Sequence, residues 1–146
     1  MKSLHKISRI KLKVNQNFNF VLFGIVSAEP DYKLSLTLNK KFRISLKHIS
    51  PIKLTDKNGH DLPFSRFSET NGSPDLIFTL ISNRHGKHFF LKELQNVDYL
   101  FQVQDCNSEK NMKLMTSNLR EIETITAVFI INVNNIKDKN LQYLTQ

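Results

Sequence analysis

Two apolar runs without a single charged residue constrain the fold of this chain more than any other feature. One is FNFVLFGIVSA, residues 18–28, and the other is ITAVFIINV, residues 125–133. Each is about half the roughly 20 residues that an apolar helix needs to cross a bilayer. A run of this length that is apolar on both faces is typical of a β-strand covered on both sides. The sequence therefore predicts a central sheet, and it gives no indication of a membrane as partner.

The length and composition fit one domain. The chain has 146 residues, of which 40% are apolar, which is enough to bury a core without disulfides or a metal. No repeat, low-complexity tract or linker divides it, so we expect a single domain over residues 1–146. The one cysteine, Cys106, cannot form an internal disulfide, and no N-terminal stretch has the apolar run of a signal peptide. An intracellular, cytoplasmic protein is the simplest expectation.

Shorter segments that alternate apolar and polar residues predict the other strands. The stretch VDYLFQVQD, residues 97–105, puts Val97, Tyr99 and Phe101 on one face. The pair Asn58-Gly59 predicts a hairpin turn, because both residue types tolerate a positive φ. Further strands are expected at residues 8–14 (SRIKLKV), 42–46 (FRISL), 64–69 (FSRFSE), 76–82 (LIFTLIS) and 87–91 (KHFFL).

Two segments have the pattern of a helix. From Ser108 the apolar period lengthens, so Met112, Met115 and Leu119 form one stripe, and Ser108 is a suitable N-cap for a helix over 108–122. Residues 30–41 allow two interpretations, because their leucines alternate as in a strand and also recur at helical spacing. Pro30 followed by an acidic residue suits a first helical turn, which favours the helix.

These elements predict an α+β fold. We expect a single domain with a mixed or largely antiparallel sheet, helices packed on one face, and a C-terminal strand–helix–strand unit over residues 97–133. One core should contain the following side chains: Val97, Tyr99, Phe101, Met112, Met115, Leu119, Val128 and Ile130.

The basic charge is concentrated in the first third of the chain. The formal net charge is +8, and residues 1–53 hold eleven Lys or Arg against two acidic residues, Glu29 and Asp31. Clustered lysine and arginine favour a polyanionic partner such as RNA or the ribosome, although a merely solvated surface explains them too. The candidate polyanion-binding residues are Arg9, Lys11, Lys13, Lys40, Lys41, Arg43 and Lys47.

No residue pattern indicates catalysis. Glu93 and Asp98 could in principle act as an acid–base pair, but their spacing at the entry to a strand favours a role in shaping the turn. His85 and His88 have a spacing found in metal sites, yet no second pair of ligands accompanies them. The chain has no glycine-rich phosphate loop. We therefore expect no enzyme activity, no cofactor and no metal.

The stretch LKELQNVDY, residues 91–99, is similar to the motif of the IPExxxVDY family. Its Glu falls on Glu93 and its Val-Asp-Tyr on Val97, Asp98 and Tyr99, while Leu91 and Lys92 stand where the family has Ile and Pro. The lysine restores a backbone N–H and frees φ, which a proline would not do. The resemblance implies an uncharacterised intracellular bacterial protein and supports the helix at 30–41, but it supplies no catalytic residues.

Two functions of different class remain open. The first is a non-catalytic binding or adaptor domain that contacts RNA, the ribosome or a protein partner, with the basic N-terminal half as the polyanion-binding part. The second is a regulatory domain that senses a small molecule, which rests on fold analogy alone. A ligand that stabilises the folded state in a thermal-shift screen would favour the second.

Overall fold

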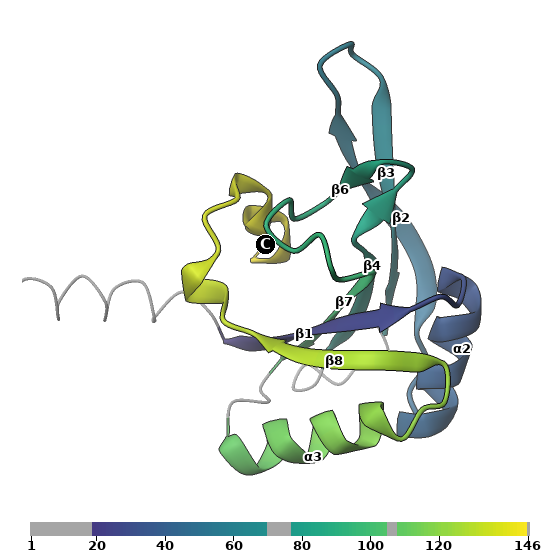
Figure 1. Ribbon diagram of the computed structural model, residues 1–146. Helices are drawn as coiled ribbons and strands as arrows, with labels where there is room; N and C mark the ends of the chain where they lie inside the picture. Colours follow the sequence, from purple (N-terminus) through teal and green to yellow (C-terminus); the bar gives the residue numbers. More distant parts are fainter. Residues whose placement is uncertain (1–18, 70–76, 105–107, 146) are drawn as a thin grey trace, which may run out of the picture.

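The computed structural model describes residues 19–69, 77–104 and 108–145, and these form one antiparallel sheet with helices (Figure 1). The sheet has six strands in the order β2-β3-β4-β7-β1-β8, and every neighbouring pair is antiparallel. The strands are β1 (Phe20–Ser27), β2 (Lys47–Thr55), β3 (Asp61–Ser68), β4 (Phe78–Ser82), β7 (Tyr99–Gln104) and β8 (Ile125–Ile131). The α+β fold is confirmed. A small separate hairpin joins β5 (Arg84–His85) to β6 (His88–Phe89).

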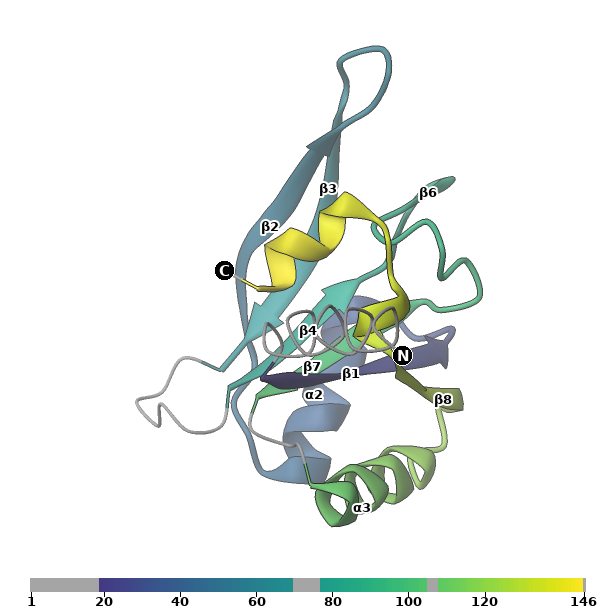
Figure 2. The same ribbon diagram turned by 90° about the vertical axis from the view of Figure 1, so that its left-hand side faces the viewer.

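Two helices cover one face of the sheet, as predicted (Figure 2). The first, α2 (Asp31–Phe42), follows Pro30 and ends where Arg43 adopts a left-handed conformation with φ 55°. The second, α3 (Glu109–Arg120), begins at Ser108, whose side chain accepts the backbone N–H of Asn111. It connects β7 to β8, which run in the same direction on either side of β1.

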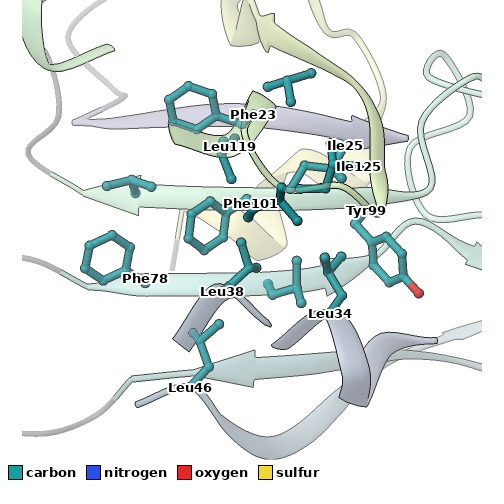
Figure 3. Close-up of a cluster of buried hydrophobic side chains, with 14 of the residues drawn as sticks. Phe23, Ile25, Leu34, Leu38, Leu46, Phe78, Tyr99, Phe101, Leu119 and Ile125 are labelled. Atoms are coloured by element: carbon teal, nitrogen blue, oxygen red, sulfur yellow. The ribbon is translucent and has the colours of Figure 1, made fainter. Parts of the chain in front are cut away.

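The core between the helices and the sheet is aromatic at its centre (Figure 3). Phe101 on β7 is fully buried and stacks on Phe78 of the neighbouring strand, with ring centroids 5.8 Å apart. Leu34 and Leu38 enter this core from α2, and Leu119 enters it from α3. Residues 30–41 therefore contain the helix that the spacing of the leucines favoured, and the alternative interpretation as a strand is wrong.

The opposite face is covered by irregular structure instead of helices. Two short 3₁₀ helices, η1 (Val133–Asn135) and η2 (Lys139–Leu144), pack there with the loop that follows β6. This second core contains Phe64 and Phe90, whose ring centroids lie 5.7 Å apart. The sheet is thus buried on both faces, as the uninterrupted apolar run of β1 indicated.

Two residues of the predicted core lie elsewhere. Val97 belongs to the second core, because it precedes β7 and packs over Gly24, where an added Cβ would lie 3.0 Å from Val97 Cγ2. Ile130 is 49% exposed because β8 is an edge strand. Met112 and Met115 only border the core. The other four predicted side chains, Tyr99, Phe101, Leu119 and Val128, are buried together.

One predicted strand is wrong and one lies outside the described residues. Residues 42–46 form the end of α2 and a connection, and the strand begins later, at Lys47. The side chain of Asn39 holds this connection, because it accepts the N–H of Leu46 and donates to its carbonyl. The expected strand at residues 8–14 is not among the described residues.

The hairpin of β2 and β3 extends well beyond the rest of the sheet (Figure 1). Its turn is the predicted Asn58-Gly59 turn, with Gly59 at φ 82°. Asp56 accepts the backbone N–H groups of Asn58 and His60, which fixes the turn. The projecting hairpin forms one wall of the site described next.

Candidate functional site

A basic cleft lies between the β2–β3 hairpin, β6, the loop after β6, and η2. Its volume is about 670 Å³. The lining includes five side chains that are cationic or can become so: Lys53, Lys57, His88, Lys92 and Lys139. We call this site the basic cleft. It brings together lysines that lie far apart in the sequence, because three separate segments converge on one face of the sheet.

Among the described residues, the lysines of the basic cleft form no ion pair with a carboxylate. The ion pairs among the described residues involve Lys41, His60, Arg84 and Lys113, and none involves a cleft lysine. Four lysine residues border this cavity, and positive charges gathered around one cavity favour an anion there. The arrangement therefore suits a ligand with several negative charges.

One carboxylate, that of Asp56, lines the cleft. Its Oδ1 accepts the N–H of Asn58 at 2.9 Å and that of His60 at 2.8 Å, and its Oδ2 lies 3.5 Å from Nδ1 of the His60 ring. The backbone N–H of His60 is the main cause that lowers the pKa of Asp56. Asp56 thus serves the turn of the hairpin and pairs with His60 instead of a cleft lysine, and its single negative charge offsets only part of the positive charge around the cleft.

Two aromatic residues, Phe89 and Tyr143, also line the cleft. The guanidinium of Arg84 lies 5.0 Å from the centre of the Phe89 ring, a cation–π distance. The Tyr143 ring packs near Phe90, with centroids 6.2 Å apart. Aromatic surfaces beside cationic groups are the combination with which proteins hold single-stranded nucleic acids.

The wall formed by η2 is held in place by a pair of carboxylates. Glu93 Oε1 accepts the backbone N–H groups of Lys137 and Asp138, each at 2.7 Å. In return, Asp138 Oδ2 accepts the backbone N–H of Lys92 at 3.0 Å. We call these reciprocal bonds the carboxylate latch. It fastens the loop after β6 to the segment that begins η2, and both carry cleft lysines.

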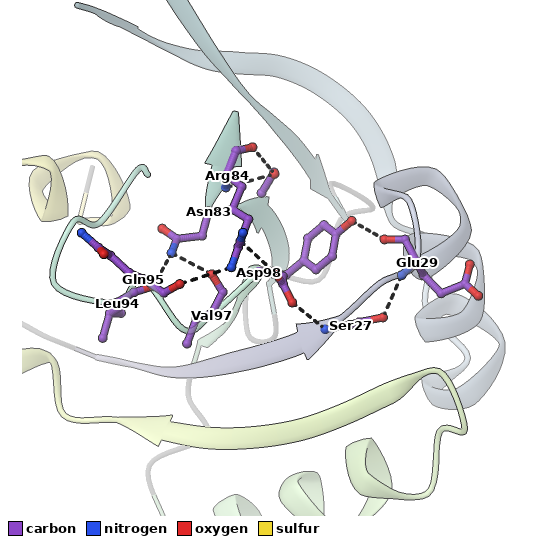
Figure 4. A network of polar contacts seen from close by, with 10 residues as sticks. Ser27, Glu29, Asn83, Arg84, Leu94, Gln95, Val97 and Asp98 are labelled. Carbon is purple, nitrogen blue, oxygen red and sulfur yellow. Dashed lines mark hydrogen bonds and ion pairs between the residues drawn. The ribbon is translucent and has the colours of Figure 1, made fainter. Parts of the chain in front are cut away.

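Asp98 and Tyr99 hold a different part of the molecule (Figure 4). The carboxylate of Asp98 accepts the N–H of Ser27 at 2.9 Å and the Nε–H of Arg84 at 2.8 Å. The Tyr99 hydroxyl donates to the carbonyl of Glu29. These bonds tie β7 to the end of β1 and to the β5–β6 hairpin. Burial, followed by the nearby carboxylates of Asp31, Asp98 and Glu29, raises the pKa of Tyr99 to about 12.

Asn83 is a structural residue that the sequence analysis did not find. It is fully buried, and its amide nitrogen donates to the carbonyls of Leu94 and Val97 at 2.8 and 3.0 Å. Its amide oxygen accepts the N–H of Leu91 at 2.8 Å. A single side chain therefore shapes the loop that carries Glu93. A lone asparagine after a strand gives no signal of such a role.

The residues predicted to bind a polyanion do not converge on the basic cleft. Arg9, Lys11 and Lys13 lie outside the described residues. Lys40, Lys41 and Arg43 are exposed at the end of α2, on the face of the sheet that the helices cover, and Lys41 forms an ion pair with Glu121. Lys47 is exposed at the start of β2. The sequence pattern did not indicate the cleft lysines, because they come from three segments that lie far apart in the sequence.

The remaining candidate side chains are those of Glu93 and Asp98 and the histidines His85 and His88. Glu93 and Asp98 bind different segments and share no hydrogen-bond partner. His85 and His88 are exposed neighbours in the β5–β6 hairpin. In the described part of the chain, no group of three or more His, Cys, Asp or Glu could hold a metal ion, and no helix is long and apolar enough to cross a membrane. No family model, curated protein or solved structure matches this chain.

Proposed function

We propose that this chain is a non-catalytic binding domain that holds single-stranded RNA in the basic cleft. The observation that carries the proposal is the convergence of Lys53, Lys57, Lys92 and Lys139 on one cavity without a carboxylate partner among the described residues. Phosphate groups gain affinity from such lysines by releasing bound counterions.

Two further features support RNA over other polyanions. Phe89 and Tyr143 offer ring surfaces on which a base can stack, and such stacking contributes about 1–3 kcal/mol per base. The amides of Asn58, Asn140 and Gln142 lie beside them and can both donate and accept hydrogen bonds. A polyanion without bases, such as polyphosphate, would use the lysines but not these groups.

The proposal includes kinship with the IPExxxVDY family. It is supported by the structural roles of the motif residues, since Glu93 holds the backbone before η2, while Asp98 and Tyr99 hold the backbone of Ser27 and Glu29 at the end of β1. None of the three faces the basic cleft as a lining residue. In this view the motif builds the fold around the cleft and does not contact the ligand.

A second function has its own support. The volume of the basic cleft, about 670 Å³, falls within the range of pockets that bind small molecules, roughly 300–1,000 Å³. A nucleotide carries both phosphates and a base, so it would use the same lysines and rings. A domain that senses a nucleotide is therefore the alternative to an RNA-binding domain.

The test compares binding of a fluorescent single-stranded RNA oligonucleotide by three proteins at low salt. The cleft variant carries Lys53→Gln, Lys92→Gln and Lys139→Gln, and the control carries Lys33→Gln, Lys110→Gln and Lys113→Gln on the helices. Both variants lose the same charge, so only a cleft site predicts weak binding by the first and near-normal binding by the second. Equal loss in both, or no binding by the wild type, contradicts the proposal.

A thermal-shift series with nucleoside mono-, di- and triphosphates distinguishes the alternative. A ligand at about 100 times its Kd stabilises the folded state by about 2.7 kcal/mol. A shift that the cleft substitutions abolish, together with absence of RNA binding, would assign the cleft to a nucleotide. RNA binding without any nucleotide shift would support the first proposal.

A further inference from the structure

The two edges of the sheet are protected very differently. The β2 edge has Lys47, Lys53 and Pro51, and a bulge between Ile49 and Ile52. Charges, proline and bulges are the usual means by which proteins prevent an edge strand from pairing with another chain. The β8 edge, with the sequence ITAVFII, has neither a charged residue nor proline. Its only irregularity is a bulge at its start, opposite Val26 and Ser27.

The β8 edge also exposes large apolar side chains. Among the described strands β8 pairs with β1 alone, so its outer backbone groups have no strand partner. Phe129 is 42% exposed and Ile130 is 49% exposed. Unpaired backbone groups beside exposed apolar side chains form a template for one more strand. The features together indicate a surface for strand addition.

We propose that the added strand is β8 of a second copy, so that two sheets continue into one across a two-fold axis. Antiparallel pairing of a strand with its own copy produces this symmetry directly, because each contact occurs twice. The net charge of +8 opposes the approach of two copies, but β8 has no charged side chain that would add to this repulsion.

The side chains of β8 indicate the register of this pairing. With the axis at Val128, Phe129 of one copy lies opposite Ala127 of the other, and the same pair recurs on the other side of the axis. The small Ala127 then leaves room for the Phe129 ring. Side chains directly opposite each other across a strand pair make the closest contact, so a large residue facing a small one fits better than two rings. The proposal does not depend on the ligand of the basic cleft.

Sedimentation of the full chain over a range of concentrations tests the dimer. We expect a reversible monomer–dimer equilibrium. Phe129→Lys should weaken it about tenfold or more, since the change enters the interface twice. The matched control is Leu36→Lys, which also places a lysine at an exposed leucine, 63% exposed, but on α2. A monomer at every concentration, or equal weakening by both substitutions, would overturn the proposal.

Cysteine cross-linking tests the register in a chain that also carries Cys106→Ser. A mixture of the Ala127→Cys and Phe129→Cys proteins should form an interchain disulfide under mild oxidation, whereas either protein alone should form far less. A cross-link in the Phe129→Cys protein alone would place the axis elsewhere and refute this register. Failure of the mixture to cross-link, in a sample shown to be dimeric, would assign the contact to another surface.

Discussion

Glu93 and Asp138 each hold the backbone beside the other. Glu93 accepts the N–H of Asp138 at 2.7 Å, and Asp138 accepts the N–H of Lys92, the residue before Glu93, at 3.0 Å. The two carboxylates come from segments 45 residues apart, and together they fix η2 as a wall of the basic cleft. Glu93 thus positions the backbone that leads into η2.

Removal of the Glu93 charge should loosen this wall. In Glu93→Gln the amide oxygen still accepts hydrogen bonds, but the bonds lose their charge assistance, so we expect a loss of about 1 kcal/mol in the free energy of unfolding. Amide hydrogen exchange at Lys137 and Asp138 should accelerate before any global change. Glu123→Gln, at an exposed residue outside these bonds, is the control. Unchanged exchange at both amides would contradict the latch.

The backbone N–H of Lys92 can be tested by proline. Lys92→Pro removes the donor to Asp138, whereas Lys92→Ala keeps it and removes only the side chain. The proline variant should therefore be less stable than the alanine variant by about 1–3 kcal/mol in urea unfolding, because one carboxylate oxygen loses its partner. Equal stability would mean that the hydrogen bond contributes nothing here.

The sequence pattern predicted the sheet, both helices and the hairpin turn because each depends on local periodicity or on one turn pair. It failed at residues 42–46, where the Asn39 side chain holds the connection, since such a bond joins two segments. The alternating pattern also placed Val97 in the wrong core, because Val97 precedes β7 and its N–H still bonds to the carbonyl of Leu94 in the preceding turn. The alternation of apolar and polar residues therefore predicts the wrong face of the sheet for a residue that lies just before a strand.

The basic cleft was beyond prediction for a related reason. Lys53, Lys92 and Lys139 come from segments that meet only after the chain has folded back across the sheet. A charge count along the sequence finds runs of lysine, such as those before residue 53, but not lysines that converge from distant segments. Asn83 is a similar case, because its three partners lie in the loop that follows it.

Phe101 should be among the most costly residues to truncate. It is fully buried and contacts Phe42 and Phe78, with ring centroids at 6.1 and 5.8 Å. Phe101→Ala should lower the free energy of unfolding by about 3–5 kcal/mol. The exposed Leu36→Ala on α2 is the control and should change it by about 0.5 kcal/mol or less. A loss below about 1 kcal/mol for Phe101→Ala would contradict its place in the core.

The buried Tyr99 hydroxyl should make stability depend on alkaline pH. Its pKa is raised from 10.0 to about 12 in the folded protein, so the unfolded state releases this proton first. The stability that Tyr99 contributes is complete below about pH 10 and is lost as the pH rises from 10 to 12. Tyr99→Phe should remove this part of the dependence. If the free energy of unfolding fell equally with pH in the wild type and in Tyr99→Phe between pH 10 and 12, this role of Tyr99 would be refuted.

The salt dependence of RNA binding is the most direct measure of the proposed function. For a single strand, the slope of log K against log salt is about −0.7 for each phosphate contact. Replacement of Lys53, Lys92 and Lys139 with Gln should therefore weaken binding and flatten the slope by about 2, whereas the helix-surface control should keep the wild-type slope. The same slope for the cleft variant and the wild type would contradict the assignment of the basic cleft as the RNA site.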